Sequence, residues 1–143
     1  PFFVGISNLN TGKIEYHNKG PLDTLVLASS SIPVLFAPVS YKNQVYADGG
    51  LIHNIPLEPL KKICKKTIAV NINPLTENNN LDGLSDIAAR TFQLSVNANV
   101  KGIEDECDIY IEPPDLADFH ILDTSKADES FNIGYEYTKK LDI

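Results

Sequence analysis

The order of apolar and polar positions predicts a β-hairpin and then a helix in the first third of the chain. Residues 2–7 and 13–18 are β-prone runs, and residues 8–12 between them include the Asn and Gly that supply the positive φ of a hairpin loop. From residue 22 the spacing becomes helical, with one face marked by Leu22, Leu25, Val26 and Ser29. This helix should end near Ser31, because Ile32 precedes Pro33 and is therefore disfavoured in the α region.

A second hairpin, a helix and a strand are expected next. Residues 36–41 and 44–47 have the pattern of two short strands around Lys42-Asn43, and they bring Asp48 to a turn. Pro56 suits the first turn of a helix that runs to about Lys66. Residues 67–73 are β-branched and almost continuously apolar, which is typical of a central strand buried on both faces.

The rest of the chain predicts a loop, a helix, a strand and a last helix. Residues 77–83 are a polar loop, and a long helix reaching toward Val100 has one face marked by Leu84, Ile87, Ala88, Thr91 and Ser95. Residues 108–112 alternate like a strand that Pro113-Pro114 stops. The last helix should begin after Asp123 or Ser125, either of which is a suitable N-cap, and run to Leu141. Strands alternating with helices indicate a layered α/β domain.

Composition excludes some classes of partner. The net charge is −7 over 143 residues: residues 1–103 carry 9 basic and 7 acidic side chains, and residues 104–143 carry 3 and 12, giving +2 and −9. Nucleic acid is not an expected partner, because binding phosphates requires concentrated positive charge. The one basic cluster is Lys61, Lys62, Lys65 and Lys66. On a helix these side chains would be neighbours that could touch anionic lipid headgroups, although a solvated face is the preferred interpretation.

Two cysteines, Cys64 and Cys107, are too few and too far apart for a disulfide framework or a zinc site, so we expect free thiols in a reducing compartment. No apolar run approaches the roughly 20 residues needed to span a bilayer, and no signal peptide is visible. These features favour a cytoplasmic protein, with peripheral contact to a membrane left open. No metal or cofactor is expected, because the carboxylates are scattered and no pair of histidines has ligand spacing.

Asp48 is the main candidate for chemistry. It ends a short β-prone run and is followed at once by Gly49 and Gly50, where a strand gives way to a sharp turn and other backbone can approach closely. Such a place suits a catalytic base. Asp-Gly-Gly is also a common turn without any chemistry, and these three residues alone favour that simpler interpretation.

The segment before Asp48 changes this balance. Residues 28–39 read Ala-Ser-Ser-Ser-Ile-Pro-Val-Leu-Phe-Ala-Pro-Val, and together with Asp48-Gly49-Gly50 they resemble the patatin-like phospholipase family. In that family an A-S-x-x-x-P-x-x-F-x-P-V block leads through a short hairpin to D-G-G or D-G-A, whose Asp is the base of a Ser-Asp dyad. The similarity continues through Asn54-Ile55-Pro56-Leu57 and, more loosely, into residues 108–113 and Gly134-Tyr135.

The resemblance implies a three-layer α/β/α sandwich around a mixed, mainly parallel sheet. It also implies a phospholipase-type esterase that hydrolyses a lipid or other ester substrate, with Asp48 as the proton acceptor and Gly49 and Gly50 in its turn. One departure is important: the family's nucleophile lies in a G-x-S-x-G elbow and its oxyanion hole in a Gly-rich loop, and neither occurs here. The nearest candidate, Gly5-Ile6-Ser7-Asn8-Leu9, lacks the second glycine.

Residues 1–143 are therefore expected to be the C-terminal portion of a single patatin-like domain, with the nucleophilic serine upstream. The absence of Met and the strand-like first residues agree with this expectation. Alone, this portion should be inactive and should leave apolar surface uncovered. Ser29, Ser30 and Ser31 have no elbow around them, and we expect them to pack and cap within the helix and the bend that follows.

Two alternatives stay open. In an ordinary Ser-His-Asp hydrolase the acid precedes the histidine in the chain, so Asp48 could act with His53 or His120. His120 is expected to be exposed or capping and His17 to end a strand, which leaves His53 as the histidine to test. The other alternative is a non-catalytic, patatin-shaped module that binds lipid or another partner.

Overall fold

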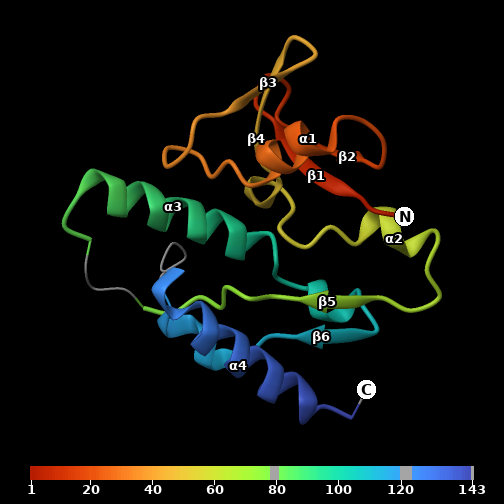
Figure 1. Ribbon diagram of the computed structural model, residues 1–143, viewed down its shortest axis with the longest axis vertical. Helices are drawn as coiled ribbons and strands as arrows, with labels where there is room; N and C mark the ends of the chain where they lie inside the picture. Colours follow the sequence, from red (N-terminus) through yellow and green to blue (C-terminus); the bar gives the residue numbers. More distant parts are fainter. Residues whose placement is uncertain (78–80, 120–123, 143) are drawn as a thin grey trace.

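The computed structural model describes residues 1–77, 81–119 and 124–142. Its first part is a four-stranded antiparallel sheet in the order β2-β1-β4-β3 (Figure 1). The strands are β1 (Val4–Asn8), β2 (Lys13–His17), β3 (Val39–Tyr41) and β4 (Gln44–Asp48). Both predicted hairpins are confirmed, since β1 pairs with β2 and β3 pairs with β4.

The turns of these hairpins explain their formation. In the second hairpin Lys42 and Asn43 have φ values of 47° and 60°, and positive φ at both positions is what a two-residue turn needs to match the twist of its strands. In the first hairpin Gly12 has a φ of 67°. The strand expected over residues 36–41 is shorter than predicted and begins only at Val39. The physical reason is Pro38, which has no N–H to donate to a neighbouring strand.

Helix α1 (Leu22–Ser29) packs on this sheet and ends where the sequence predicts. The core between them consists of Val4, Ile6, Leu25, Ala28 and Tyr46. The predicted helix face is partly wrong, because Leu22 and Val26 are exposed whereas Ala28 is buried. Leu25 and Ala28, three positions apart, form the contact, so the buried stripe is narrower than the one expected from the spacing of apolar residues.

The second part is a parallel pair of strands, β5 (Ile68–Val70) and β6 (Ile109–Ile111). Helix α3 (Leu84–Ala98) lies between them in the chain, as parallel pairing requires a crossover connection. The prediction of burial on both faces of β5 is wrong. Ala69 is buried, but Ile68 and Val70 are 54% and 51% exposed, and Ile72 just after the strand is 61% exposed.

Two helices differ from expectation. Helix α2 (Glu58–Lys61) is much shorter than the predicted helix to Lys66, and residues 61–66 are all exposed, so no apolar contact stabilises further turns. Helix α3 buries Phe92 and Val96, whereas Leu84 and Ile87 of the predicted face are exposed. Part of the predicted loop over residues 77–83 lies outside the described residues.

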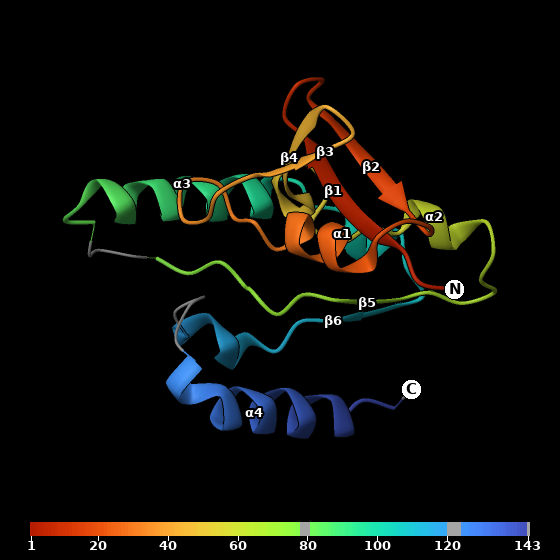
Figure 2. The same cartoon turned by 45° about the horizontal axis from the view of Figure 1, so that its top comes forward.

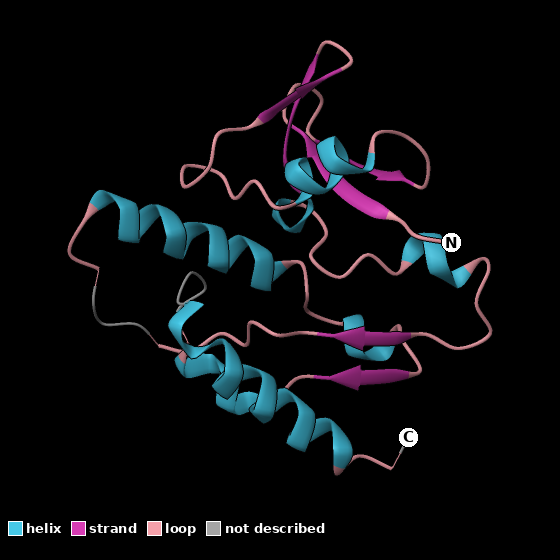
Figure 3. Ribbon diagram, viewed as in Figure 1, coloured by secondary structure: helices cyan, strands magenta, loops and turns pink. Residues whose placement is uncertain are grey.

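Helix α4 (Ala127–Lys139) follows a single 3-10 turn, η4 (Thr124–Lys126), that contains Ser125; the other predicted start, Asp123, lies outside the described residues. Figure 2 shows the four-stranded sheet with α1 on one side, then the β5–β6 pair, and then α4 on the far side. Helices and strands alternate along the chain (Figure 3), so the α/β prediction is confirmed at this level.

The expected mainly parallel sheet is not present in the part of the chain that the structure describes, where three of the four strand pairings are antiparallel. Two of these three pairings follow from the hairpins, because short loops can join only antiparallel strands. The third joins β1 to β4, which are far apart in the chain. The longest described helix, α3, has 15 residues. No helix among the described residues combines the length and the apolar character needed to cross a bilayer.

Candidate active site

Asp48 is the last residue of β4 and lies opposite Ile6 of β1. Its backbone N–H donates to the carbonyl of Ser31 at 2.9 Å. The chain then turns into a short 3-10 helix, η1 (Gly49–Leu51), and the Gly50 N–H donates to Asp48 Oδ1 at 2.8 Å. The carboxylate is therefore held at the point where the strand ends, by backbone on both sides of the turn.

The two glycines are required by close packing. A Cβ on Gly49 would lie 2.4 Å from the carbonyl oxygen of Gly5 in β1, so the backbones of β1 and the turn touch directly. A Cβ on Gly50 would lie 2.9 Å from Asn54 Oδ1 and 3.1 Å from Asp48 Oδ1. The predicted close approach of backbone is thus confirmed at Gly49, whereas Gly50 approaches side chains.

Burial raises the pKa of Asp48 above its ordinary value, and the hydrogen bond from Gly50 N–H offsets part of this rise. Oδ1 accepts that bond, whereas Oδ2 accepts no hydrogen bond from any residue within 1–77, 81–119 and 124–142. A half-buried carboxylate with one anchored oxygen, one unengaged oxygen and a raised pKa is a stronger base than an exposed aspartate. Its geometry and basicity suit the acceptance of a proton.

The serines near this turn have structural contacts. Ser7 is fully buried and its Oγ donates to the Gly49 carbonyl at 3.4 Å. Ser29 Oγ donates to the Gly5 carbonyl at 2.8 Å, and Ser31 Oγ donates to the Leu27 carbonyl at 2.7 Å. Ser30 Oγ likewise donates to carbonyls one turn earlier in α1. The predicted packing and capping role of residues 29–31 is confirmed.

Asn99, at the end of α3, is a contributor that the sequence did not indicate. Its side chain bonds Gly50, Leu51 and Asn54, all in the segment that follows Asp48. An Asn at a helix end is so ordinary that its type and position give no signal. The contact joins residues more than 40 positions apart, which periodicity cannot reveal.

His53 is directed to a different group of residues. Its Nδ1 lies 2.7 Å from the Tyr16 hydroxyl and 3.0 Å from Glu58 Oε1, and Tyr16 donates to Glu58 Oε2 at 2.7 Å. Burial and this bond to Glu58 raise the pKa of Tyr16. Burial alone would raise the pKa of Glu58, but the Tyr16 hydroxyl and the nearby His53 outweigh it and lower that pKa.

No hydrogen bond joins His53 to Asp48 in the described part of the chain. The other candidate, His120, lies outside the described residues. His17 ends β2 as predicted, with its Nε2 3.2 Å from Glu15 Oε2. The contacts of His53 therefore connect β2 to α2.

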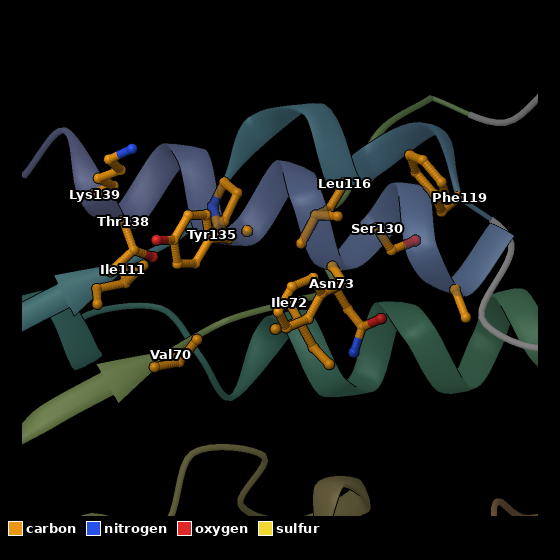
Figure 4. Close-up of a pocket in the computed structure, with 14 residues that line it drawn as sticks. Val70, Ile72, Asn73, Ile111, Leu116, Phe119, Ser130, Tyr135, Thr138 and Lys139 are labelled. Carbon is orange, nitrogen blue, oxygen red and sulfur yellow. The ribbon is translucent and has the colours of Figure 1, made fainter.

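A separate apolar cavity of about 890 Å³ opens between β5, β6 and α4 (Figure 4). Val70 and Ile72 line one side, and Phe131 and Tyr135 of α4 line the other. Figures 1 and 2 place α4 on the far side of the β5–β6 pair from β4 and the turn after it. This cavity is therefore separate from the surroundings of Asp48.

The basic cluster does not form a helical face, because α2 ends at Lys61 and the other three lysines follow it. Lys61 Nζ lies 2.6 Å from Glu106 Oε2, and the acidic residues 104–106 and 108 lie on the neighbouring segment. Cys64 and Cys107 are free thiols, as predicted. Within the described residues no group of three or more His, Cys, Asp or Glu side chains could hold a metal ion.

Comparison with known proteins agrees with the motif around Asp48. Residues 3–61 match the family described as patatin-like phospholipase. Over 98% of its length the chain is similar to the protein named Lysophospholipase NTE1 of Scheffersomyces stipitis, at 26% identity, of Debaryomyces hansenii, at 27%, and of Candida albicans, at 26%.

The aligned part is 11%, 11% and 12% of these three relatives, so the chain spans about a tenth of the length of the curated relatives it matches. The match over residues 3–61 contains β1 to β4, Asp48 and its turn. The resemblance of this chain to the patatin-like phospholipase family is therefore confirmed by the family match over residues 3–61, and nearly the whole chain is similar to the named lysophospholipases.

Proposed function

We propose that this chain supplies the general base of a serine-dependent lipid acyl hydrolase, with Asp48 as the proton acceptor of a Ser-Asp dyad. The observation that carries the proposal is the state of Asp48: Oδ1 is anchored by Gly50 N–H at 2.8 Å, and burial raises the pKa of the carboxyl group. The named relatives are lysophospholipases, which supports a lipid ester as the substrate class.

In the proposed reaction the serine hydroxyl gives its proton to Asp48 Oδ2 as its Oγ attacks the ester carbonyl. The proton then passes from Asp48 to the oxygen of the leaving alcohol, and an acyl-enzyme remains. Water attacks the acyl-enzyme, Asp48 accepts a proton from this water, and return of that proton to serine releases the fatty acid. A raised pKa on Asp48 favours each acceptance, because the efficiency of a general base follows its basicity.

We further propose that residues 1–143 form the C-terminal portion of a single patatin-like domain, a three-layer α/β/α sandwich whose nucleophile lies outside this chain. Two features support this proposal. The 143 residues contain no G-x-S-x-G elbow. The apolar side chains of Val70, Ile72, Phe131 and Tyr135 line the cavity between β5 and α4 and are all more than half exposed, as expected for a sheet and helix layer that further elements continue.

Substitution Asp48→Asn in the full-length protein tests the proposal. Asn keeps the volume and is favoured in such turns, so the fold should persist, but its amide cannot accept the proton of serine. Turnover of a lysophospholipid should fall by roughly 10²–10⁴-fold, the contribution of a general base, while the unfolding midpoint stays near that of wild type.

Asp86→Asn is a matched control, because Asp86 Oδ2 also accepts a backbone N–H, from Gly83 at 3.0 Å. Asp86 lies in the first turn of α3, whereas the turn after Asp48 contacts Asn99 at the end of that helix. The control should keep nearly full activity. A folded Asp48→Asn enzyme with near-normal turnover would remove the catalytic role of Asp48 and leave a non-catalytic, patatin-shaped module as the better description.

A further inference from the structure

The side chain of Asn99 connects the turn after Asp48 to α3 through hydrogen bonds. Asn99 Nδ2 lies 3.2 Å from the Gly50 carbonyl oxygen and 3.4 Å from that of Leu51. Its Oδ1 accepts the backbone N–H of Asn54 at 3.1 Å. One half-buried amide thus contacts both ends of the segment 50–54.

These contacts exceed what a helix end needs. The Ser95 carbonyl, which Asn99 Nδ2 meets at 3.2 Å, already accepts the backbone N–H of Asn99 at 3.3 Å, so the end of α3 does not require this side chain. The other three partners belong to the segment that begins two residues after Asp48. Packing reinforces the same junction, since Leu51 packs against the buried cluster that contains Phe92 and Val96 of α3.

Gly50 connects the hydrogen bonds of Asn99 to the carboxylate of Asp48. Its carbonyl accepts from Asn99, and its N–H donates to Asp48 Oδ1 at 2.8 Å. On the other side of the turn, Gly49 rests against the Gly5 carbonyl. The orientation of the Gly50 N–H therefore depends on contacts from β1 and from α3, and Asn99 provides the polar contact from α3 to Gly50 itself.

We propose that Asn99 is a positioning residue for Asp48: it holds the turn against α3 so that Gly50 N–H stays on Oδ1 and Oδ2 is left for proton transfer. This inference rests on the proposed role of Asp48 as the general base. Asn99 touches neither the substrate nor the reacting atoms in this scheme, and it acts through Gly50.

The arrangement predicts a change in pH dependence. Burial raises the pKa of Asp48 and the Gly50 N–H lowers it, so loosening Gly50 should raise that pKa further. β1 and η1 have no ionisable side chains. The other elements around this turn carry five ionisable groups: Asp23 of α1, Tyr41 of β3, Tyr46 of β4, and Asp86 and Arg90 of α3. None of these groups contributes to the pKa shift of Asp48.

The experiment compares Asn99→Ala with Asn97→Ala in the full-length protein. Asn97 is the matched control, because it is also half-buried near the end of α3, but its Nδ2 donates only to the Gln93 carbonyl of its own helix, at 3.2 Å. For both variants kcat/KM for a lysophospholipid is measured across pH, together with the unfolding midpoint.

Asn99→Ala should lose on the order of 10-fold to 100-fold in kcat/KM, as misplacement of a catalytic group does, with the loss greatest at acidic pH. A base works only when deprotonated, so a raised pKa of Asp48 moves the acid limb of the profile to higher pH. Asn97→Ala should keep the limb of wild type. If Asn99 had a purely structural role, Asn99→Ala would lower the unfolding midpoint and leave the acid limb of the pH profile unchanged.

Asn99→Leu provides a second test if Asn99→Ala does not fold. It keeps a side chain of similar size and adds no charge, but it removes the donor to Gly50 and Leu51, so the acid limb should again move to higher pH. An unmoved limb in a folded Asn99 variant would overturn the positioning role, while an inactive Asp48→Asn would still support the base. Full activity of Asp48→Asn would instead refute the proposed function itself.

Discussion

Gly49→Ala is the sharpest test of how tightly the turn after Asp48 is packed. The added Cβ would lie 2.4 Å from the Gly5 oxygen and 2.8 Å from the Gly5 carbonyl carbon. Separations below 3.0 Å essentially do not occur for real Cβ atoms, so the oxygen contact alone requires a shift of at least 0.6 Å, the difference between 3.0 and 2.4 Å. The clash is with backbone, which cannot rotate away as a side chain can.

The shift is costly because Gly5 is held on several sides. Gly5 lies opposite Tyr16 in the β1–β2 pairing, and its carbonyl accepts from Ser29 Oγ at 2.8 Å. Overpacking a site of this kind costs about 1–3 kcal/mol, and the fixed backbone places Gly49→Ala at the upper end of that range. For a chain of this size such a loss lowers the unfolding temperature by roughly 6–12 °C.

The assay is thermal and urea unfolding of the purified protein, with Gly134→Ala as the matched control. Gly134 lies within α4, and a Cβ there would meet nothing within 4 Å. The control should gain about 0.5–1 kcal/mol, because Ala is a better helix former than Gly. If Gly49→Ala unfolded within about 0.5 kcal/mol of wild type, the range of ordinary surface substitutions, the direct contact between β1 and the turn would be refuted.

Two further predictions concern residues around the site. His53→Gln in the full-length protein should keep kcat within about tenfold of wild type, because His53 contacts Tyr16 and Glu58, and loss of a triad histidine would cost far more; a folded but inactive variant would favour the Ser-His-Asp alternative. Asp108→Asn should destabilise the fold at neutral pH, and its difference from wild type in urea unfolding should shrink as pH falls below about 4. Hydrogen bonds from the Thr67 backbone and hydroxyl lower the pKa of Asp108, so its stabilisation is complete above its ordinary pKa and is lost as pH falls through the lowered one; a difference independent of pH would contradict this cause.

The hairpins and the position of Asp48 could be predicted because their determinants are local. Lys42-Asn43 and residues 8–12 specify turns through their own backbone preferences, and these turns determine the β1–β2 and β3–β4 pairings. The motif from residue 28 to Gly50 then indicated which carboxylate to examine. Short segments of sequence were enough for the hairpins, whereas the choice of Asp48 also needed the resemblance to a known family.

The faces that are buried could not be predicted in the same way. Periodicity shows which residues share a face, but whether another element covers that face depends on the tertiary arrangement. Ile68, Val70 and Leu84 are apolar and correctly spaced, yet all three are exposed in the described structure. Asn99 was missed for a related reason, since its role depends on a contact across 49 positions, to Gly50.

The carboxyl groups with shifted pKa values differ in the direction of the shift. Burial by itself would raise the pKa of Glu15 and of Glu58, but several donors and a nearby histidine outweigh it and lower both values. Bonds from Thr67 lower the pKa of Asp108. Each of these groups is stabilised as an anion and is therefore a weaker base than a free carboxylate.

The pKa of Asp48 shifts in the opposite direction from those of these three groups, and for a different cause. Burial raises its pKa, its one hydrogen-bond donor among the described residues is the neutral N–H of Gly50, and no cation contributes. A carboxylate that served only to cap the turn would gain from more donors or a basic neighbour, because either would strengthen its hold on the backbone. Without such partners the carboxylate of Asp48 is held less strongly but keeps a high affinity for a proton, which is the property that general-base catalysis requires.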